Sequence, residues 1–251
     1  MKITRVSYEG RAYWAKIEES SVTLLKEPPF DNIDPLKDLS LTDIKLLIPA
    51  EPQKIVLVGL NYRDHAGELD MEIPDEPIIF FKPPSSLIKD GDSIVYPIGV
   101  KRLDYEAELA VVIKREAKDI KESEAADYIL GYSCLNDVTA RDIQKRDIQW
   151  SRAKSFDSFA PFGPWIETEL ELDSLRVKSY LNSELRQDST ISDFIFPLPE
   201  LLSFISSVMT LKPGDIVSTG TPSGVGSMEI GDNVSVEIDG IGRLSNTVIS
   251  C

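Results

Sequence analysis

The chain has 251 residues, of which 27 are Lys or Arg and 42 are Asp or Glu, so its formal net charge is −15. This acidic excess disfavours binding to nucleic-acid phosphates and to anionic lipid head groups. A hydrophobic content of 42% is enough for a large buried core. The single histidine, His65, excludes a multi-histidine zinc site, so any metal should be held mainly by oxygen atoms.

The cysteine content and the lengths of the apolar runs indicate the cellular compartment in which the protein is expected. Only Cys134 and Cys251 are present, without a CxxC pair or a disulfide framework, which is typical of a reducing cytosol. Residues 1–20 carry charges throughout and lack the apolar segment of a signal peptide. No apolar run approaches the roughly 20 residues that a membrane helix needs. We therefore expect a cytoplasmic protein with no membrane or nucleic-acid partner.

The first 50 residues have the pattern of a small β-rich domain. Strands are expected in 3–10, 11–19 and 21–27, with a Gly-containing turn between the first two. A loop rich in Pro and Asp follows, and the Ser/Thr capping signal at the start of 40–49 predicts a helix there. The breaker cluster PAEPQ predicts a boundary, giving a small N-terminal domain, 1–50, and a larger domain, 51–251.

The larger domain is richer in predicted strands than in predicted helices. Short buried strands are expected in 54–60 and 77–83. Three Gly-Asp turns each lead into a run of β-branched residues, which predicts further strands. The pattern indicates an α+β, mainly β fold with a mainly antiparallel or mixed core. The three turn segments are 89–97, 212–220 and 229–238, and the predicted helices are 121–132, 137–147 and 198–209.

The segment RLDYEAELAVVI, residues 102–113, reads as one strand. Asp104, Glu106 and Glu108 occupy alternate positions, so a regular strand would point all three carboxylates to one face. Like charges on one face repel each other. The row is explained either by a solvated or edge strand, or by a divalent cation that the carboxylates coordinate.

A further carboxylate precedes a predicted helix. If the helix begins near Asn136 or Asp137, then Asp137, Arg141 and Gln144 share one face. Asp137 is then either a helix cap paired with Arg141, or a third metal ligand beside an arginine suited to a substrate carboxylate.

Three other segments contain candidate catalytic groups. His65 precedes Glu68 by three residues, which is either a chance acidic neighbour or an orienting carboxylate for a general base. Lys154 lies in a loop rich in aromatic residues, Pro and Gly. Its methylene groups either pack against this loop, or its ammonium group stabilises a developing enolate or a carboxylate. The turn with Thr219 and Thr221 either only connects strands or forms a nest that stabilises an oxyanion.

Taken together and in this order, the segments resemble the fumarylacetoacetate hydrolase family. The resemblance covers about residues 54–248, and the first 50 residues look like the small N-terminal domain that some members carry. The segments are GLNYRDHAGE, FFKP, DYEAELAVVI, NDVTARDIQ, RAKSFDSFAPFGPWI and GDIVSTGTPSGVG.

The resemblance implies a fold, a metal and a set of site residues. The fold would be a β-rich roll of mixed sheets, usually assembled as a homodimer. A bound Mg²⁺ or Mn²⁺ is implied, with a water-activating dyad and basic and polar groups around it. The implied metal ligands are Glu106, Glu108 and Asp137, the catalytic groups His65, Glu68 and Lys154, and the substrate-binding residues Arg141, Gln144 and Thr221.

The resemblance also implies a reaction class. We expect a metal-dependent enzyme acting on a 2-oxo acid, which hydrolyses the C–C bond of an acylpyruvate of the fumarylpyruvate or fumarylacetoacetate type, as in aromatic catabolism. Decarboxylation of an oxaloacetate-type substrate and isomerisation of 2-hydroxyhepta-2,4-diene-1,7-dioate would use the same enolate. A non-catalytic cation-binding module remains an alternative of a different class.

Overall fold

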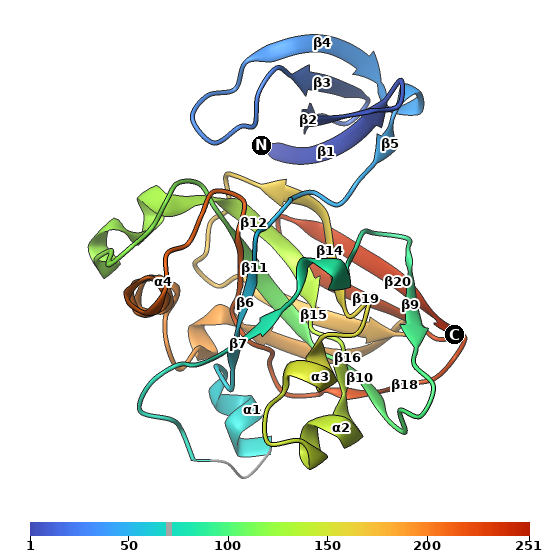
Figure 1. Ribbon diagram of the computed structural model, residues 1–251, viewed down its shortest axis with the longest axis vertical. Helices are drawn as coiled ribbons and strands as arrows, with labels where there is room; N and C mark the ends of the chain where they lie inside the picture. Colours follow the sequence, from blue (N-terminus) through green and yellow to red (C-terminus); the bar gives the residue numbers. More distant parts are fainter. Residues whose placement is uncertain (69–71) are drawn as a thin grey trace.

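The computed structural model describes residues 1–68 and 72–251, and it confirms the expected mainly β fold with mixed sheets (Figure 1). The largest sheet has the strand order β4-β3-β2-β1-β14-β12-β11-β17-β6-β7, with β5 beside β1 and β8 beside β14. A five-stranded sheet, β16-β15-β19-β20-β9, and a three-stranded sheet, β13-β10-β18, complete the architecture. Antiparallel pairs dominate, and β6 and β17 form one of the parallel pairs.

The centre of the large sheet is built by β11 (Ala107–Ile113) and β12 (Ile129–Asn136). All seven residues of β11 are buried, because apolar clusters cover both of its faces. This explains the uninterrupted apolar run 109–113 that follows Glu108 in the strand. The other strands of this part of the sheet are β6 (Ile55–Gly59), β7 (Ile78–Lys82), β8 (Leu87–Ile88), β14 (Ala160–Glu167) and β17 (Ile216–Ser218).

The five-stranded sheet packs on one face of β11 and β12. Val177 and Val236 from this sheet share a buried cluster with Ala107 and Leu109. The strands of the two smaller sheets are β9 (Ser93–Tyr96), β15 (Arg176–Leu181), β16 (Glu184–Thr190), β19 (Asn233–Ile238) and β20 (Gly242–Ser250), and β10 (Leu103–Tyr105), β13 (Thr139–Ala140) and β18 (Gly226–Met228).

The N-terminal strands lie at one end of the molecule (Figure 1). The three expected strands are present, but the helix expected after Ser40 is wrong: Ser40 caps only the single 3-10 turn η1 (Leu41–Asp43). Strand β1 pairs with β14, with Ile3 opposite Ile166, so these strands continue the large sheet. The N-terminal strands are β1 (Lys2–Tyr8), β2 (Arg11–Ile17), β3 (Ser21–Leu25), β4 (Pro35–Ser40) and β5 (Lys45–Leu46).

The helices are short, and of the three predicted in the larger domain the structure contains one almost as predicted, shortens another and lacks the third. The predicted helix at 198–209 is present as α4 (Leu198–Val208). The helix predicted at 121–132 is wrong, because only the 3-10 helix η3 (Glu122–Tyr128) forms before β12 pairs with β11. The remaining helices are α1 (Arg63–Glu68), α2 (Arg141–Arg146), α3 (Ser151–Lys154), η2 (Pro84–Ser86) and η4 (Ile191–Asp193).

Within the described parts of the chain, no helix combines the length and the apolar character needed to cross a membrane.

The expectation of one strand over 102–113 is also wrong. The chain leaves the three-stranded sheet after β10 and enters the large sheet at β11, and Glu106 lies at the crossing. The Glu106 N–H donates to Asn136 Oδ1 at 2.9 Å instead of a neighbouring strand, and Asp137 N–H donates to Glu106 O at 2.8 Å. This interruption separates Asp104 from the two glutamates and brings Asp137 beside them.

Candidate metal centre and the cavity around it

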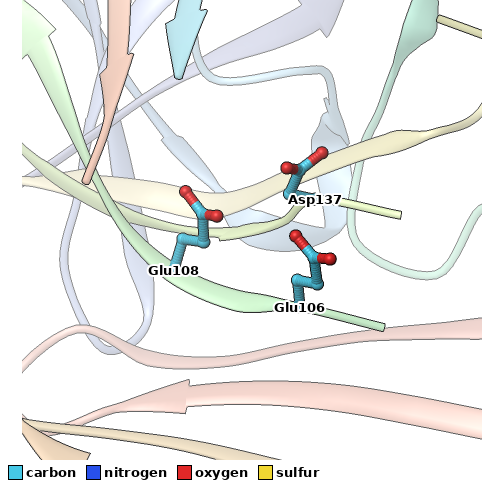
Figure 2. Close-up of side chains that lie close together, drawn as sticks. All are labelled: Glu106, Glu108 and Asp137. Carbon is cyan, nitrogen blue, oxygen red and sulfur yellow. The ribbon is translucent and has the colours of Figure 1, made fainter. Parts of the chain in front are cut away.

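Glu106, Glu108 and Asp137 form a buried cluster in which one oxygen of each carboxylate lies within 4.8 Å of those of the other two (Figure 2). The register of two antiparallel strands brings them together, because Ala107 on β11 is opposite Asn136 on β12. The residues that flank this pair therefore meet, although about 30 positions separate them in the sequence. No other such cluster of acidic, histidine or cysteine ligands occurs in the described residues.

Each carboxylate has defined protein partners. Lys154 Nζ donates to Glu106 Oε2 at 2.8 Å and to Asp137 Oδ2 at 2.5 Å, so its ammonium bridges two of the three acids. Glu108 Oε2 accepts hydrogen bonds from Ser218 Oγ at 2.5 Å and from Gly220 N–H at 3.0 Å. Among the residues that the structure describes, Glu108 therefore has hydrogen-bond donors at this oxygen but no paired cation.

The surroundings shift the pKa values of the two glutamates in opposite directions. Burial raises the pKa of Glu108 well above its usual range, and the charges of Asp137 and Glu106 raise it further. Burial alone would also raise the pKa of Glu106, but the charges of Lys154 and Arg141 hold it well below its usual range. A cation near Glu108 would remove the repulsion that raises the pKa of this carboxyl group.

The donor set fits a hard divalent cation. All three side chains offer carboxylate oxygens, the ligands that Mg²⁺ and Mn²⁺ prefer. Asp137 Oδ1 is buried and accepts no aligned hydrogen bond from any residue that the structure describes, although Lys82 Nζ lies 2.8 Å from it. Glu106, Glu108 and Asp137 would therefore hold the ion, as the sequence suggested.

Lys82, at the end of β7, is a site residue to which sequence reasoning assigned no role. It is fully buried, and its Nζ donates to Val138 O at 2.9 Å and to Phe159 O at 2.7 Å besides its ion pair with Asp137. Burial lowers the pKa of Lys82 to about 8, against the opposing effect of Asp137. The available signal was a lysine ending the apolar run IIFFK.

Arg141 is held by carboxylates other than the expected one. The sequence suggested an ion pair with Asp137 on a shared helix face, but α2 begins only at Arg141, and Asp137 precedes it in a loop. Arg141 Nε donates to Asp104 Oδ2 at 2.8 Å, and its terminal nitrogens donate to Glu106 and, at 2.6 Å, to Gln144 Oε1. The buried Asp104 thus holds an arginine and lies outside the metal cluster.

His65 and Glu68 form the contact that their spacing suggested. Both lie on the short helix α1, and His65 Nδ1 is 3.0 Å from Glu68 Oε2. The Glu68 carboxylate also accepts from Gly224 N–H at 3.2 Å, which ties the dyad to the turn after β17. Because an ionised carboxylate only accepts, the neutral tautomer of His65 that fits this contact has its proton on Nδ1 and its lone pair on Nε2.

The two threonines of that turn have different surroundings. Thr219 Oγ1 donates to Leu109 O at 2.9 Å, so this hydroxyl is used by the fold and not by an oxyanion nest. Thr221 Oγ1 accepts from Gln187 Nε2 at 2.8 Å, and Thr221 lines the cavity beside the carboxylates. Gln187 lies far away in the sequence, and nothing in its local pattern marks it.

A cavity of about 220 Å³ joins these groups. It is lined by all the predicted site residues except Glu68, which reaches it through His65. One wall is apolar and includes Trp150 and Phe80, whose rings meet edge to face with centroids 5.3 Å apart. The residues that line it from the predicted set are His65, Glu106, Glu108, Asp137, Arg141, Gln144, Lys154 and Thr221.

The family models and curated relatives agree with this geometry. Residues 54–249 match the fumarylacetoacetate (FAA) hydrolase C-terminal model, and residues 1–49 match the Rv2993c-like N-terminal model. An uncharacterised protein of Archaeoglobus fulgidus is 52% identical, covering 96% of this chain and 93% of its own. Oxaloacetate tautomerase YisK of Bacillus subtilis is 42% identical over 83% of this chain and 74% of its own. A bifunctional isomerase/decarboxylase of 4-hydroxyphenylacetate degradation from Salmonella dublin is 42% identical over 76% of this chain and 46% of its own.

Solved structures give the same result. 5-Carboxymethyl-2-hydroxymuconate delta-isomerase of Mycobacterium smegmatis superposes with a TM-score of 0.94 at 38% identity, over the full length of both chains. Fumarylpyruvate hydrolase of Pseudomonas aeruginosa, solved with Mn²⁺ and pyruvate, gives 0.76 at 32% identity over 82% of this chain and 92% of its own. The family match spans most of the chain, and the chain is therefore a member of the fumarylacetoacetate hydrolase family of enzymes.

Proposed function

We propose that this enzyme hydrolyses the C–C bond of an acylpyruvate in the presence of Mg²⁺ or Mn²⁺. The observation that carries the proposal is the hydrogen-bonded His65–Glu68 pair at the cavity that also contains the three carboxylates. Hydrolysis requires a base for water close to the group that stabilises the leaving enolate. The known fumarylpyruvate hydrolase with bound Mn²⁺ and pyruvate supports this assignment by similarity.

The side chains can divide the reaction between them. When bound, the divalent cation would act as a Lewis acid on the 2-oxo and carboxylate oxygens of the substrate and stabilise enolate charge. His65 Nε2 takes a proton as water adds to the distal carbonyl carbon. The C–C bond then breaks, and its electron pair passes to the pyruvate fragment as an enolate. Protonation of that fragment by His65 gives pyruvate and a free acid.

The basic residues act on the negative charges of the substrate. The Arg141 guanidinium, held by Asp104, presents a planar set of donors suited to a carboxylate. Lys154, held between Glu106 and Asp137, keeps an ammonium beside the carboxylates, where it can stabilise developing charge.

Isomerisation, tautomerisation or decarboxylation of a 2-oxo acid is the second candidate. It is favoured by two relatives, the oxaloacetate tautomerase at 42% identity and the delta-isomerase at 38%. These reactions use the same enolate, and His65 would then move a proton between substrate atoms instead of activating water.

The experiment that separates these reactions uses ¹⁸O-labelled water. Purified protein is incubated with Mg²⁺ and a panel of acylpyruvates, oxaloacetate and 2-hydroxydienoates, and products are followed by proton NMR and mass spectrometry with and without a chelator. Hydrolysis predicts metal-dependent pyruvate and a free acid that carries one ¹⁸O from water. Ketonisation without cleavage, or CO₂ release from oxaloacetate alone, would replace hydrolysis with the second candidate.

Replacement of His65 tests whether the His65–Glu68 pair takes part in the reaction. His65→Asn should lower hydrolysis by at least about 100-fold, the contribution of a positioned general base. The control is Asp64→Asn, a neighbouring acid on the same helix that lies outside the dyad and hydrogen-bonds Ser223. Equal rates for His65→Asn and wild type would contradict the assignment.

A further inference from the structure

Gln187 is a buried amide on a strand that is otherwise exposed in this region. It lies on β16, its two neighbours Arg186 and Asp188 are exposed, and its own side chain is almost fully enclosed. The five-stranded sheet contributes this residue, whereas the carboxylates come from elements of the large sheet. Burial of a glutamine requires that its amide hydrogen bonds be satisfied.

The three hydrogen bonds of Gln187 fix which way its amide faces. Ala107 N–H donates to Oε1 at 3.0 Å, and Nε2 donates to Pro222 O at 2.8 Å. A backbone N–H can only donate and a carbonyl can only accept, so the oxygen and nitrogen of this amide cannot be exchanged. The second Nε2 proton therefore points to Thr221 Oγ1, 2.8 Å away.

This orientation determines the polarity of the Thr221 hydroxyl. Because the oxygen accepts from Gln187, the hydroxyl proton must be directed elsewhere. Within residues 1–68 and 72–251, no protein atom accepts it, and Thr221 lines the cavity beside the carboxylates. The hydroxyl is thus arranged to donate to a ligand.

The backbone around the turn is shaped for this contact. Gly224 has φ +93°, and a Cβ at this position would lie 2.3 Å from Arg186 O. The turn can therefore lie directly against β16, where the amide reaches it. Ala107, the third partner, stands between Glu106 and Glu108, so the same amide ties the turn to the strand that carries the carboxylates.

We propose that Gln187 is a positioning residue that holds the Thr221 hydroxyl as a hydrogen-bond donor to an acceptor oxygen of the substrate. The identity of that oxygen rests on the proposed function: it is a carboxylate or 2-oxo oxygen of the pyruvate portion. The arrangement favours a ligand that presents an acceptor oxygen at this point of the cavity.

A double-mutant cycle tests the proposal by binding. The affinity of pyruvate for the Mg²⁺-loaded protein is measured by calorimetry for Thr221→Val, Gln187→Met and the double variant. Loss of a hydrogen bond to a charged ligand should weaken binding about 10-fold in Thr221→Val, and a smaller loss is expected in Gln187→Met. In the Thr221→Val background, Gln187→Met should cause no further loss, because its effect passes through the hydroxyl.

The controls separate positioning from a general structural role. Ser189→Ala, a buried polar residue on the same face of β16 that bonds Asp193, should leave pyruvate affinity unchanged. Thr221→Ser, which retains the hydroxyl, should bind within about threefold of wild type. The proposal would be overturned if the losses of pyruvate affinity in the two single variants multiplied in the double variant. It would also be overturned if Thr221→Ser and Thr221→Val lost the same affinity. The second comparison can be made even if Gln187→Met does not fold.

Because pyruvate binding is measured and not turnover, the role of Gln187 can be tested separately from the proposed hydrolysis. If pyruvate binds but no acylpyruvate is hydrolysed, the reaction is wrong and the cycle still decides the role of Gln187. Absence of pyruvate binding to the metal-loaded wild-type protein would contradict both.

Discussion

Lys82 Nζ lies 2.8 Å from Asp137 Oδ1, and neither side chain is exposed by more than 1%. The lysine reaches this acid from β7, the last strand of the large sheet, while Asp137 follows β12 near its centre. The pair therefore joins two parts of the sheet at the carboxylate cluster. Lys82 Nζ also donates hydrogen bonds to the carbonyl oxygens of Val138 and Phe159.

Lys82→Met should destabilise the metal-free protein. Without Lys82, the buried Asp137 would share Lys154 with Glu106, and the free energy of unfolding should fall by about 3 kcal/mol. The added negative charge should strengthen cation binding, so Mg²⁺ should raise the Tm of the variant more than that of wild type. Denaturant unfolding and thermal melts with and without Mg²⁺ measure both effects.

The control for this variant is Lys178→Met. Lys178 pairs with the half-exposed Asp239 at 2.9 Å, and an exposed ion pair contributes at most about 1 kcal/mol. Similar destabilisation by the two substitutions would show that burial of the Lys82 pair has no special cost.

Asp104→Asn should impair substrate binding more than turnover. Asp104 accepts from Arg141 Nε and Arg102 Nε, each at 2.8 Å, and it is fully buried. With only one acceptor oxygen and no charge, Asn holds Arg141 less firmly, and KM should rise roughly 10-fold with a smaller change in kcat. Steady-state kinetics on the accepted substrate gives both constants.

Arg102→Met provides the comparison for Asp104→Asn. The Arg102 side chain is about half exposed, so its loss should change KM by less than about threefold. A fall in kcat with unchanged KM for Asp104→Asn would instead place Asp104 in the chemical step.

Gly220→Ala should disturb the support of Glu108. Gly220 has φ +93°, and an added Cβ would lie 2.9 Å from Asn61 Cβ and 3.1 Å from Val58 O. The strain and the crowding together should cost about 2–4 kcal/mol of stability. Its N–H donates to Glu108, so metal affinity should also fall. Thermal melts and metal titration measure the two losses.

Gly231→Ala isolates the cost of the backbone angle. Gly231 has φ +98°, close to that of Gly220, but no atom of the described residues lies within 4 Å of the added Cβ. It should cost about 1–2 kcal/mol and leave metal affinity unchanged. Equal destabilisation by the two substitutions would contradict the role given to crowding at Gly220.

Much of the fold could be predicted from local sequence patterns. The Gly-Asp turns before β9, β17 and β19 and the apolar run of β11 produced strands where they were expected. The spacing of His65 and Glu68 was also enough to predict the contact between their side chains, because residues three apart lie about one helical turn from each other. These features depend only on neighbours along the chain.

The remaining features depend on partners that are distant in sequence. The strand breaks at Glu106 because the side chain of Asn136 takes its N–H, and alternation alone contains no such signal. Lys82 and Gln187 acquire their partners only when β7 and β16 are brought to the site. Their local sequence could not identify them as site residues.

The central claim is that Glu106, Glu108 and Asp137 bind a divalent cation, and Mn²⁺ titration followed by electron paramagnetic resonance tests it most directly. The six-line signal of free Mn²⁺ should disappear until about one ion per chain is bound. Glu108→Gln should weaken this binding strongly, whereas Glu167→Gln, which neutralises a buried acid paired with the N-terminus, should not. Binding that is absent in wild type, or that is equal in both variants, would contradict the account.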